Sequence, residues 1–318
     1  MSTYLITGVA GFIGSSLARA VLAQGDAVRG IDNFSTGKRT NLAEILDRID
    51  FREADLLDLE ALQSACQGVD FVLHEAAIPS VPRSVSNPLE SNRANVDATV
   101  NVLVAARNAK VKRVVYAASS SAYGETPTLP KREDMFPAPI SPYAVAKLAS
   151  EYYMASFFAC YGLETVALRY FNIFGPRQDP TSPYSGVLAK FITQMLKGEQ
   201  PTIFGDGKQS RDFTYVDNVV HANLLACKAP ASGVAGKVFN VATGSRIDLN
   251  DMFRVVKQIV GYPGEVQYGP ERAGDVKHSL ADLSRAEKYL GYRPQVNFEE
   301  GLRRTIDWYR AQEKLARA

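Results

Sequence analysis

The stretch Thr7-Gly8-Val9-Ala10-Gly11-Phe12-Ile13-Gly14 decides the fold of this 318-residue chain. It follows a short apolar run at residues 4–7 and precedes a helical run at residues 15–24. Glycines allow a tight turn and the close approach of a ligand to the backbone, and a helix N-terminus favours a diphosphate. Because the spacing G-x-x-G-x-x-G is wider than the common dinucleotide fingerprint, a plain strand-to-helix turn is the alternative interpretation.

Outward from this stretch, short β-branched runs alternate with amphipathic helical segments. The predicted strands cover residues 4–7, 27–31, 49–52, 71–74, 113–117 and 165–169. This alternation is typical of a Rossmann-type α/β fold, a doubly wound parallel sheet with right-handed crossovers. Ligands bind such sheets at the carboxyl ends of the strands, which is where the glycine stretch lies.

Beyond Asn172 the chain becomes rich in proline, glycine and aromatic residues, which predicts a loop-rich region suited to holding a ligand. Regular patterns return in a helical run at residues 216–226 and a strand-like run at residues 237–241. We therefore expect a dinucleotide-binding domain over residues 1–171, rejoined by about residues 213–245. A smaller C-terminal α/β lobe, which binds substrate, is expected over residues 172–212 and 246–318.

The composition excludes several function classes. A net charge of +2 gives no electrostatic case for nucleic acid or an acidic membrane as a partner. The three cysteines form no C-x-x-C pair and the three histidines are scattered, so we expect neither a disulfide framework nor a metal site. No apolar run approaches the roughly 18 residues that span a bilayer, and a soluble, cytoplasmic protein is expected.

Asp32 ends the second predicted strand, 18 residues after Gly14. A carboxylate at this place suits the hydroxyls of an adenosine ribose and would repel a 2′-phosphate, so NAD is favoured over NADP. The alternative interpretation of Asp32 is a loop cap. The residues that could complete the ribose pocket are Asn33, Ser35, Thr36 and Gly37.

Tyr143 and Lys147 stand four residues apart, so in a helix the phenol and the ammonium share one face. A phenol has a pKa of about 10, and a cation beside it favours the phenolate, which can then act as a base. The pair alone occurs often by chance, as two exposed helix residues. Here the pair is stronger evidence of a catalytic site, because Ser119, at the end of a predicted strand, precedes it in an α/β chain with a glycine turn.

With these motifs, the chain resembles the extended short-chain dehydrogenases/reductases, and most closely their NAD-dependent UDP-hexose 4-epimerases. The resemblance runs from Gly8 to about Asp282. Further motifs that carry it are His74-Glu75-Ala76-Ala77, Ser119 to Gly124, Arg169-Tyr170-Phe171-Asn172, Ser210-Arg211-Asp212-Phe213 and Arg272-Ala273-Gly274-Asp275.

The resemblance implies a role for each matched residue. Tyr143 is the base and acid on the sugar 4-hydroxyl, Lys147 lowers its pKa, and Ser119 hydrogen-bonds the hydroxyl. Cofactor contacts are implied for Gly8, Gly11, Phe12, Ile13, Gly14, Asp32, Asn33, Ser35, Thr36, Gly37, Asp55, Leu56, Ala76, Ala77, Asn95, Tyr143, Lys147 and Tyr170. Substrate contacts are implied for Ser80, Ser119, Ser120, Ser121, Tyr143, Asn172, Gln178, Arg211, Arg272, Asp275 and Ser279, with the two arginines on the diphosphate.

The residues after Ser119 favour epimerisation over elimination. The dehydratases and decarboxylases that the chain resembles carry an acid at this place, whereas here the first acid is Glu125, beyond Gly124. The implied reaction is removal of the 4-hydroxyl proton by Tyr143 with hydride passing to tightly bound NAD. The 4-keto sugar then turns over in the pocket and receives the hydride on its other face.

The pocket residues favour an N-acetylated sugar. In the family, a small residue at the place of Ser279 admits a 2-N-acetyl group, and a tyrosine excludes it. The run at residues 80–84 and the triple serine also resemble the UDP-N-acetylglucosamine 4-epimerase subgroup, and the lysine that glucose-specific members often have near Pro79 is missing. We expect UDP-GlcNAc/UDP-GalNAc as substrates, with UDP-Glc/UDP-Gal as further ones. The alternatives are a UDP-glucuronate 4-epimerase, another nucleotide-sugar epimerase or reductase, and a non-catalytic NAD-binding regulator.

The resemblance also implies a homodimer. Two helices, over about residues 92–107 and following Lys147, form the subunit contact in the family. Leu148, Tyr152 and Phe158 would then face the partner subunit.

Overall fold

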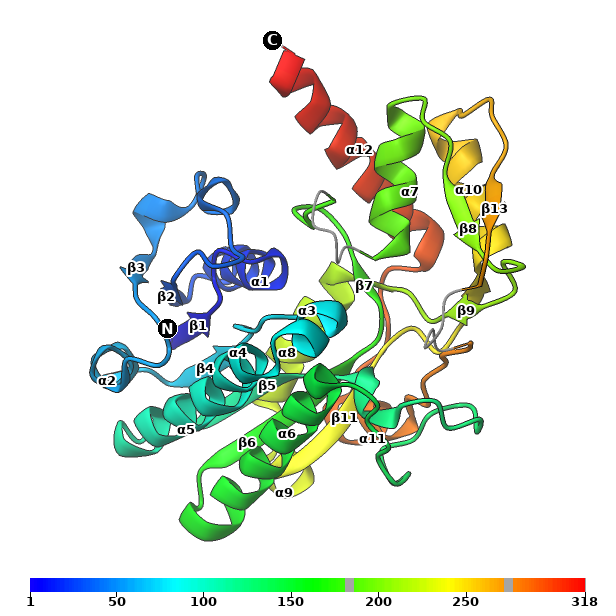
Figure 1. Ribbon diagram of the computed structural model, residues 1–318. Coiled ribbons are helices and arrows are strands. Elements are labelled where there is room, and N and C mark those ends of the chain that lie inside the picture. The colour runs from blue at the N-terminus through cyan, green and yellow to red at the C-terminus, as the bar shows by residue number, and fades with distance from the viewer. Residues whose placement is uncertain (181–185, 272–276, 318) are drawn as a thin grey trace.

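A seven-stranded parallel sheet forms the centre of the structure, a computed structural model that describes residues 1–180, 186–271 and 277–317 (Figure 1). Its strands are β1 (Thr3–Thr7), β2 (Ala27–Asp32), β3 (Asp50–Glu53), β4 (Phe71–His74), β5 (Arg113–Ser119), β6 (Glu164–Tyr170) and β11 (Lys237–Val241). They lie in the order β11-β6-β5-β4-β1-β2-β3. The predicted doubly wound sheet is confirmed, and Asp32 and Ser119 are the last residues of β2 and β5.

The strand order reverses between β1 and β4, which pair directly with Thr7 opposite His74. From β1 the chain builds outward to β2 and β3, and from β4 it builds the other way to β5 and β6. Gly8 follows β1 and Glu75 follows β4. The two loops therefore meet at the switch point, where doubly wound sheets bind their ligands.

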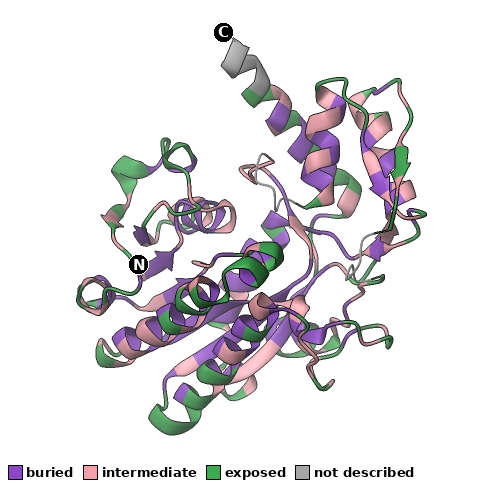
Figure 2. Ribbon diagram, viewed as in Figure 1, coloured by how far each residue is buried: buried purple, intermediate pink, exposed green. Residues whose placement is uncertain are grey.

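Helices cover both faces of this sheet, as Figure 2 shows by the buried strands between them. One face is covered by α1 (Phe12–Ala23), α8 (Val216–Lys228) and α11 (Ser284–Leu290), and the other by α2 (Leu59–Cys66), α5 (Ala98–Asn108) and α6 (Pro142–Tyr161). Each face of the sheet packs against its helices in an apolar core. The side chains of successive strand residues point alternately into these two cores, so Ile6 lies in the core with α1 and Leu5 in the core with α5. The shorter elements are α3 (Val81–Ser86), α4 (Pro88–Asn92), α9 (Ala231–Val234), η1 (Arg39–Asn41), η2 (Leu46–Arg48), the π-helical η3 (Arg93–Asp97) and η4 (Ser120–Tyr123).

A smaller α/β lobe packs around a core of its own. It contains α7 (Val187–Leu196), α10 (Leu249–Val260), α12 (Phe298–Arg317) and the paired short strands β7 (Ile173–Phe174) with β10 (Thr214–Tyr215), β8 (Thr202–Phe204) with β13 (Gln267–Gly269), and β9 (Ser210–Arg211) with β12 (Ile247–Asp248). The loop-rich interpretation of this region missed α7. Its buried residues Leu188, Phe191, Ile192 and Met195 follow the helical spacing, so the signal was present in the sequence.

After the first part of this lobe, which ends with β10, the chain returns to the central sheet. β11 pairs in parallel with β6, with Lys237 opposite Val166 and Val241 opposite Tyr170. The division into two domains at residues 171, 212 and 245 stays a prediction.

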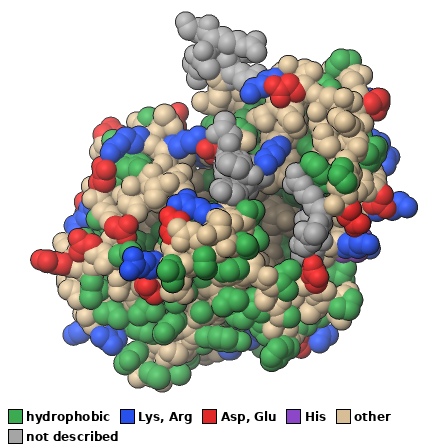
Figure 3. All heavy atoms as spheres, in the orientation of Figure 1, with side chains coloured by type: hydrophobic (Ala, Val, Ile, Leu, Met, Phe, Trp, Pro, Cys, Tyr) green, Lys and Arg blue, Asp and Glu red, His purple; other side chains and the backbone are tan. Residues whose placement is uncertain are grey.

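The face expected to meet a partner subunit is only partly exposed. Tyr152 and Phe158 on α6 are 60% and 38% exposed, whereas Leu148 is buried within the chain. Leu148 was therefore wrongly placed on the outer face. Figure 3 shows hydrophobic side chains gathered in the lower part of the view, where Figure 1 places α4, α5 and α6.

Candidate active site

The glycine turn between β1 and α1 is a position where side chains do not fit. Gly8 has a φ of +67°, and a Cβ on it would lie 2.7 Å from the Ala76 Cα. A Cβ on Gly14 would lie 2.2 Å from the Gly8 carbonyl oxygen. The N-cap of α1, Gly11, provides no side chain that could bond the first helical N–H groups. The turn thus presents a backbone surface and a helix N-terminus, which suits a diphosphate.

Asp32 lies beside this turn with its carboxylate fixed by the backbone. It accepts hydrogen bonds from the N–H groups of Ala10 at 2.9 Å and Phe34 at 2.8 Å. Burial raises the pKa of Asp32, and these backbone hydrogen bonds oppose the shift. The carboxylate is thereby held at the end of β2, where a ribose hydroxyl can reach it.

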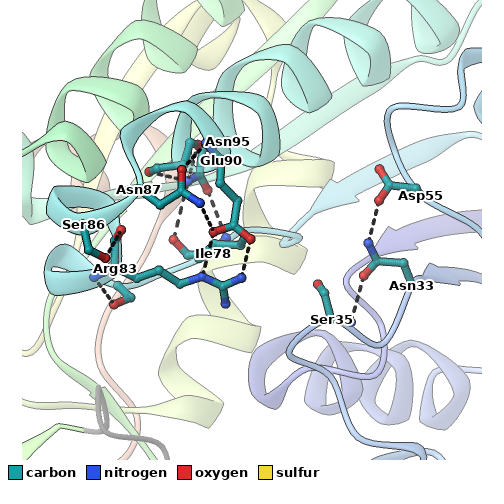
Figure 4. Close-up of polar contacts among 11 residues, drawn as sticks. Asn33, Ser35, Asp55, Ile78, Arg83, Ser86, Asn87, Glu90 and Asn95 are labelled. Carbon is teal, nitrogen blue, oxygen red and sulfur yellow. Dashed lines mark hydrogen bonds and ion pairs between the residues drawn. The ribbon is translucent and has the colours of Figure 1, made fainter.

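Asn33 and Asp55 form the edge of the cleft next to Asp32. The Asn33 amide donates to Asp55 Oδ2 at 2.7 Å, and the Ser35 N–H donates to Asn33 Oδ1 at 3.0 Å. Figure 4 shows these residues on one side and the ion pair of Arg83 with Glu90 on the other. Both groups line the same cleft, so they form its two walls.

A capped helix start positions the catalytic pair. The Ser141 hydroxyl accepts the Ala144 N–H at 3.2 Å, and Pro142 occupies the first turn, so α6 begins just before Tyr143. Lys147 follows one helical turn later and is only 3% exposed. Its ammonium donates to the Ala117 carbonyl at 2.8 Å and lies 4.8 Å from the centre of the Tyr116 ring.

Burial dominates the ionisation of both members of this pair. It raises the pKa of Tyr143 to about 12, and a hydrogen bond with Ser119 opposes the shift. It lowers the pKa of Lys147 to about 8, and the charges of Glu75 and Glu151 oppose the shift. In this structure burial of the phenol outweighs any effect of Lys147, whose ammonium donates to the Ala117 carbonyl, so the expected lowering of the Tyr143 pKa by Lys147 stays a prediction.

Ser119 connects β5 to the serine run that follows. Its hydroxyl oxygen accepts hydrogen bonds from the Ser121 hydroxyl at 2.8 Å and the Ser121 N–H at 3.2 Å. Together with the hydrogen bond to Tyr143, these contacts fix the serine at the carboxyl end of the strand. A substrate hydroxyl placed here would meet both Ser119 and Tyr143.

One cleft of about 1670 Å³ brings nearly all the predicted residues together. This volume exceeds that of a typical drug-sized site and is suited to two nucleotides. The predicted residues that line it are Gly8, Gly11, Phe12, Ile13, Gly14, Asp32, Asn33, Ser35, Thr36, Asp55, Leu56, Ala76, Ala77, Ser80, Ser119, Ser120, Ser121, Tyr143, Lys147, Tyr170, Asn172, Gln178, Arg211 and Ser279.

Two predicted cofactor residues lie behind the lining. Gly37 packs against Ala10 and the Asp32 carboxylate, where a Cβ would come within 3.0 Å of the latter. The Asn95 side chain instead holds the loop after β4, since it accepts the Ile78 N–H at 3.2 Å and donates to the Ser91 carbonyl at 2.9 Å. Both predictions of cofactor contact stay predictions. Arg272 and Asp275 lie outside the described residues.

Asn172 and Ser279, both predicted to contact the sugar, lie together in the cleft. Asn172, at a φ of +40°, donates to the Ser279 hydroxyl at 3.1 Å and to the Asp212 carbonyl at 3.0 Å. The nearby Arg211 lines the cleft and donates to the carbonyl of Lys277 at 3.2 Å. The segment that carries Ser279 is thereby tied to the end of β6.

Sequence reasoning assigned no role to two charged residues of the cleft. Glu75 follows β4, and its carboxylate accepts the Tyr170 hydroxyl at 2.8 Å. Arg177 donates to the Ser16 hydroxyl of α1 at 3.0 Å, and among the described residues its buried Nε has no hydrogen-bond partner. An acid directly after an apolar strand and an arginine after Gly175-Pro176 were the available signals.

Within residues 1–180, 186–271 and 277–317, no three His, Cys, Asp or Glu side chains are grouped so that they could hold a metal ion. In the same part of the chain, no helix combines the length and the apolar character that crossing a membrane requires.

Comparison with known proteins agrees with this geometry. The model of the NAD dependent epimerase/dehydratase family matches residues 4–242. The chain belongs to this family. The expected resemblance to extended short-chain dehydrogenases/reductases is confirmed by that match, and so is NAD as the cofactor of the family.

Three similar proteins show the range within the epimerase/dehydratase family. A UDP-glucose 4-epimerase of Mycolicibacterium smegmatis is 40% identical over 96% of this chain and 98% of its own length. The structure of a UDP-N-acetylglucosamine 4-epimerase from Methanobrevibacter ruminantium M1, in complex with UDP-N-acetylmuramic acid, is 41% identical with a TM-score of 0.93, covering 98% and 99% of the chains. A UDP-glucuronic acid 4-epimerase mutant from Bacillus cereus, in complex with NAD and a fluorinated UDP-glucuronic acid analogue, is 32% identical with a TM-score of 0.90, covering 98% and 99%.

Proposed function

We propose that the protein is an NAD-dependent UDP-sugar 4-epimerase that acts on UDP-GlcNAc and UDP-GalNAc, and secondarily on UDP-Glc and UDP-Gal. The observation that carries this proposal is the placement of Ser119, Tyr143 and Lys147 in one cleft with the glycine turn. The similarity to sugar-nucleotide 4-epimerases supports it.

The residues of the cleft fit the cofactor. The N-terminus of α1 would face its diphosphate, together with the guanidinium of Arg177, whose Nε lacks a partner. Asp32 would accept the ribose hydroxyls. When bound, NAD takes up a hydride from the sugar and gives it back.

The proton chemistry belongs to Tyr143. In this proposal the phenol exchanges the proton of the sugar 4-hydroxyl, and the Ser119 hydroxyl orients that hydroxyl. Because burial raises the pKa of Tyr143 to about 12, the phenol needs a nearby positive charge to act as a base. In this proposal Lys147, one helical turn away on α6, supplies that charge.

The residues beside Ser119 favour reversible chemistry over elimination. Ser120, Ser121 and Ala122 are the first three residues of the turn η4, and none of them can act as an acid or base at neutral pH. An elimination would need such a group next to the reacting carbon. Epimerisation removes and returns the same hydride and proton, so Tyr143 alone suffices.

The sugar end of the cleft supports an N-acetylated substrate. Ser279 is a small residue there, and Asn172 and the Asp212 N–H hold its hydroxyl in place. Ser80, Ser121 and Gln178 line the same cleft and offer polar groups to the acetamido group. A second candidate is UDP-glucuronate 4-epimerisation, which the similarity to the Bacillus cereus enzyme supports.

The partner we propose is a second copy of the chain. The exposed side chains of Val145, Tyr152 and Tyr153 on α6 and of Leu89 on α4 form an apolar surface that a dimer would cover.

One experiment tests the reaction. The purified protein is incubated separately with UDP-GlcNAc, UDP-Glc and UDP-GlcA, without added NAD, and the products are resolved by NMR. We expect UDP-GalNAc from the first, with a slower conversion of the second. A 4-epimer only from UDP-GlcA would favour the second candidate, and no epimer from any substrate would refute the proposed activity.

A further inference from the structure

Glu75 is a half-buried carboxylate that the proposed reaction leaves without a role. It follows β4 at the switch point of the sheet and lines the cleft. The Tyr170 hydroxyl donates to its Oε1 at 2.8 Å, and the Asn223 amide of α8 donates to the Tyr170 oxygen at 2.8 Å. The carboxylate is thus fixed by residues of β6 and α8 and has no freedom to turn away.

The charges around Glu75 are few. Lys147 of α6 is the cation that acts on it, and Lys147 is buried. The other nearby acid, Glu151, forms a buried ion pair with Arg169 at 2.7 Å. Since Glu151 is already paired with the Arg169 guanidinium, Glu75 is the carboxylate that can interact with a further positive charge in the cleft.

The remaining titratable groups that face Glu75 are neutral. His74, next in the chain, bonds Thr7 and Thr99 through its two ring nitrogens, and burial lowers its pKa to about 3. Burial raises the pKa values of Tyr170 on β6 and Tyr116 on β5 well above the usual range. Lys147 itself, whose pKa burial lowers to about 8, is the other group here that titrates near neutral pH, so the difference between wild type and Glu75→Gln, and not the wild-type value alone, reports on Glu75.

A nicotinamide ring carries a positive charge when oxidised and none when reduced. To serve the carbon whose hydroxyl meets Tyr143, the ring must lie close to Tyr143 and Lys147, and hence within Coulomb range of Glu75. We propose that the Glu75 carboxylate is a counter-charge that favours the oxidised over the reduced form of the bound cofactor. This rests on the proposed function in taking NAD as the ligand of the cleft and Tyr143 as the group that meets the reacting hydroxyl.

Such a counter-charge would keep the bound cofactor in the oxidised form that the next substrate requires. Hydride returns to the sugar more readily when the oxidised ring is stabilised, so less enzyme remains with reduced cofactor after a turnover. Burial raises the pKa of Glu75 to about 7, so the carboxylate is charged at about pH 8.5 and protonated at about pH 5.5. The preference should weaken as the pH falls through this range.

The test compares the affinities for the two redox forms and needs no turnover. The holoenzyme is exchanged against an excess of NAD and NADH in fixed ratio, free nucleotide is removed by rapid gel filtration, and the bound ratio is measured by chromatography. At about pH 8.5 we expect Glu75→Gln to shift the bound ratio about tenfold toward NADH, a change produced by about 1.4 kcal/mol. The wild-type ratio should move in the same direction when the pH is lowered to about 5.5, and the difference from Glu75→Gln should shrink to less than about twofold.

Glu133→Gln provides the matched control. Glu133 is another largely buried acid with a raised pKa, but it bonds the Asn240 N–H at 2.7 Å and faces Arg285 and Asp282. This variant should keep the wild-type ratio. The proposal is overturned if Glu75→Gln leaves the ratio at about pH 8.5 within about twofold of wild type, or if Glu133→Gln shifts it equally. If neither NAD nor NADH were bound to wild type or to either variant, the proposed function would be overturned as well. This outcome distinguishes failure of the proposed function from failure of the Glu75 proposal alone.

Discussion

The side-chain amide of Asn172 donates a hydrogen bond to the hydroxyl of Ser279 over 3.1 Å. The two residues are 107 positions apart in the chain, and they join the end of β6 to the wall of the cleft. The Asp212 N–H bonds the same hydroxyl at 3.3 Å. If the proposed function is right, the size of the side chain at position 279 sets the space that is left for the sugar.

Ser279→Tyr should close the pocket to N-acetylated sugars. A phenol in place of the hydroxyl occupies space that the acetamido group needs, so we expect kcat/KM for UDP-GlcNAc to fall by about 10²-fold or more. UDP-Glc should be affected less than about threefold. NMR progress curves with each substrate measure both values.

Ser279→Ala is the control for the lost hydrogen bonds, because it removes them without adding bulk. We expect it to affect both substrates alike, with a loss of less than about tenfold. If Ser279→Tyr lowers the activity on both sugars equally, Ser279 does not control the pocket.

Tyr143→Phe should abolish most of the turnover. Removing a general acid–base group lowers kcat by about 10²- to 10⁴-fold, while the cofactor should still copurify with the protein. Tyr152→Phe, on the exposed part of the same helix, should keep kcat within about twofold. Near-normal activity of Tyr143→Phe would show that another group moves the proton.

Arg177→Gln should loosen the cofactor. The guanidinium lies against the first turn of α1, and a charged hydrogen bond to a diphosphate stabilises binding by about 1.5–3 kcal/mol. The dissociation constant of NAD should thus rise by about 10- to 100-fold, measured by isothermal titration after nucleotide exchange. Arg19→Gln is the matched control, because Arg19 pairs with the exposed Glu44 near α1 and does not line the cleft. An equal loss of NAD affinity in both variants would show that the net positive charge of this region, and not Arg177 itself, determines the binding.

The pH dependence of stability should contain a contribution from Glu75. Its pKa in the folded protein, about 7, lies above the ordinary value of 4.5, so the folded state binds the proton more tightly. This contribution is fully present below about pH 4.5 and is lost as the pH rises through about 7. The free energy of unfolding of wild type minus that of Glu75→Gln should therefore fall, by on the order of 2 kcal/mol, between about pH 4.5 and 8 in urea titrations. A constant difference across this range would show that Glu75 is not buried as described.

The sequence predicted the elements that local patterns determine. The strand ends at Asp32 and Ser119, the glycine turn and the start of the helix bearing Tyr143 all follow from short-range signals. Periodicity, turn glycines and the Ser141-Pro142 cap act within a few residues, so they can be recognised without the fold.

The parts that could not be predicted depend on contacts between distant segments. The bond of Lys147 to the Ala117 carbonyl and the burial of Tyr143 decide the pKa values of the pair, and neither is visible in the spacing of four residues. Likewise, Asn95 was assigned to the cofactor because of its position, but the loop at Ile78 occupies its amide. Arg177 and Glu75 acquire their surroundings only when the second lobe and the sheet come together.

The place of β11 at the edge of the sheet has a consequence for synthesis of the chain on the ribosome. β11 follows the first part of the second lobe, yet it covers the edge of β6, which is made some seventy residues earlier, at Glu164–Tyr170. Until residue 241 has emerged, the backbone of β6 remains an open edge that could pair with another nascent chain. Protection of this edge during translation, more than the stability of the finished sheet, should then limit how much protein reaches the native state.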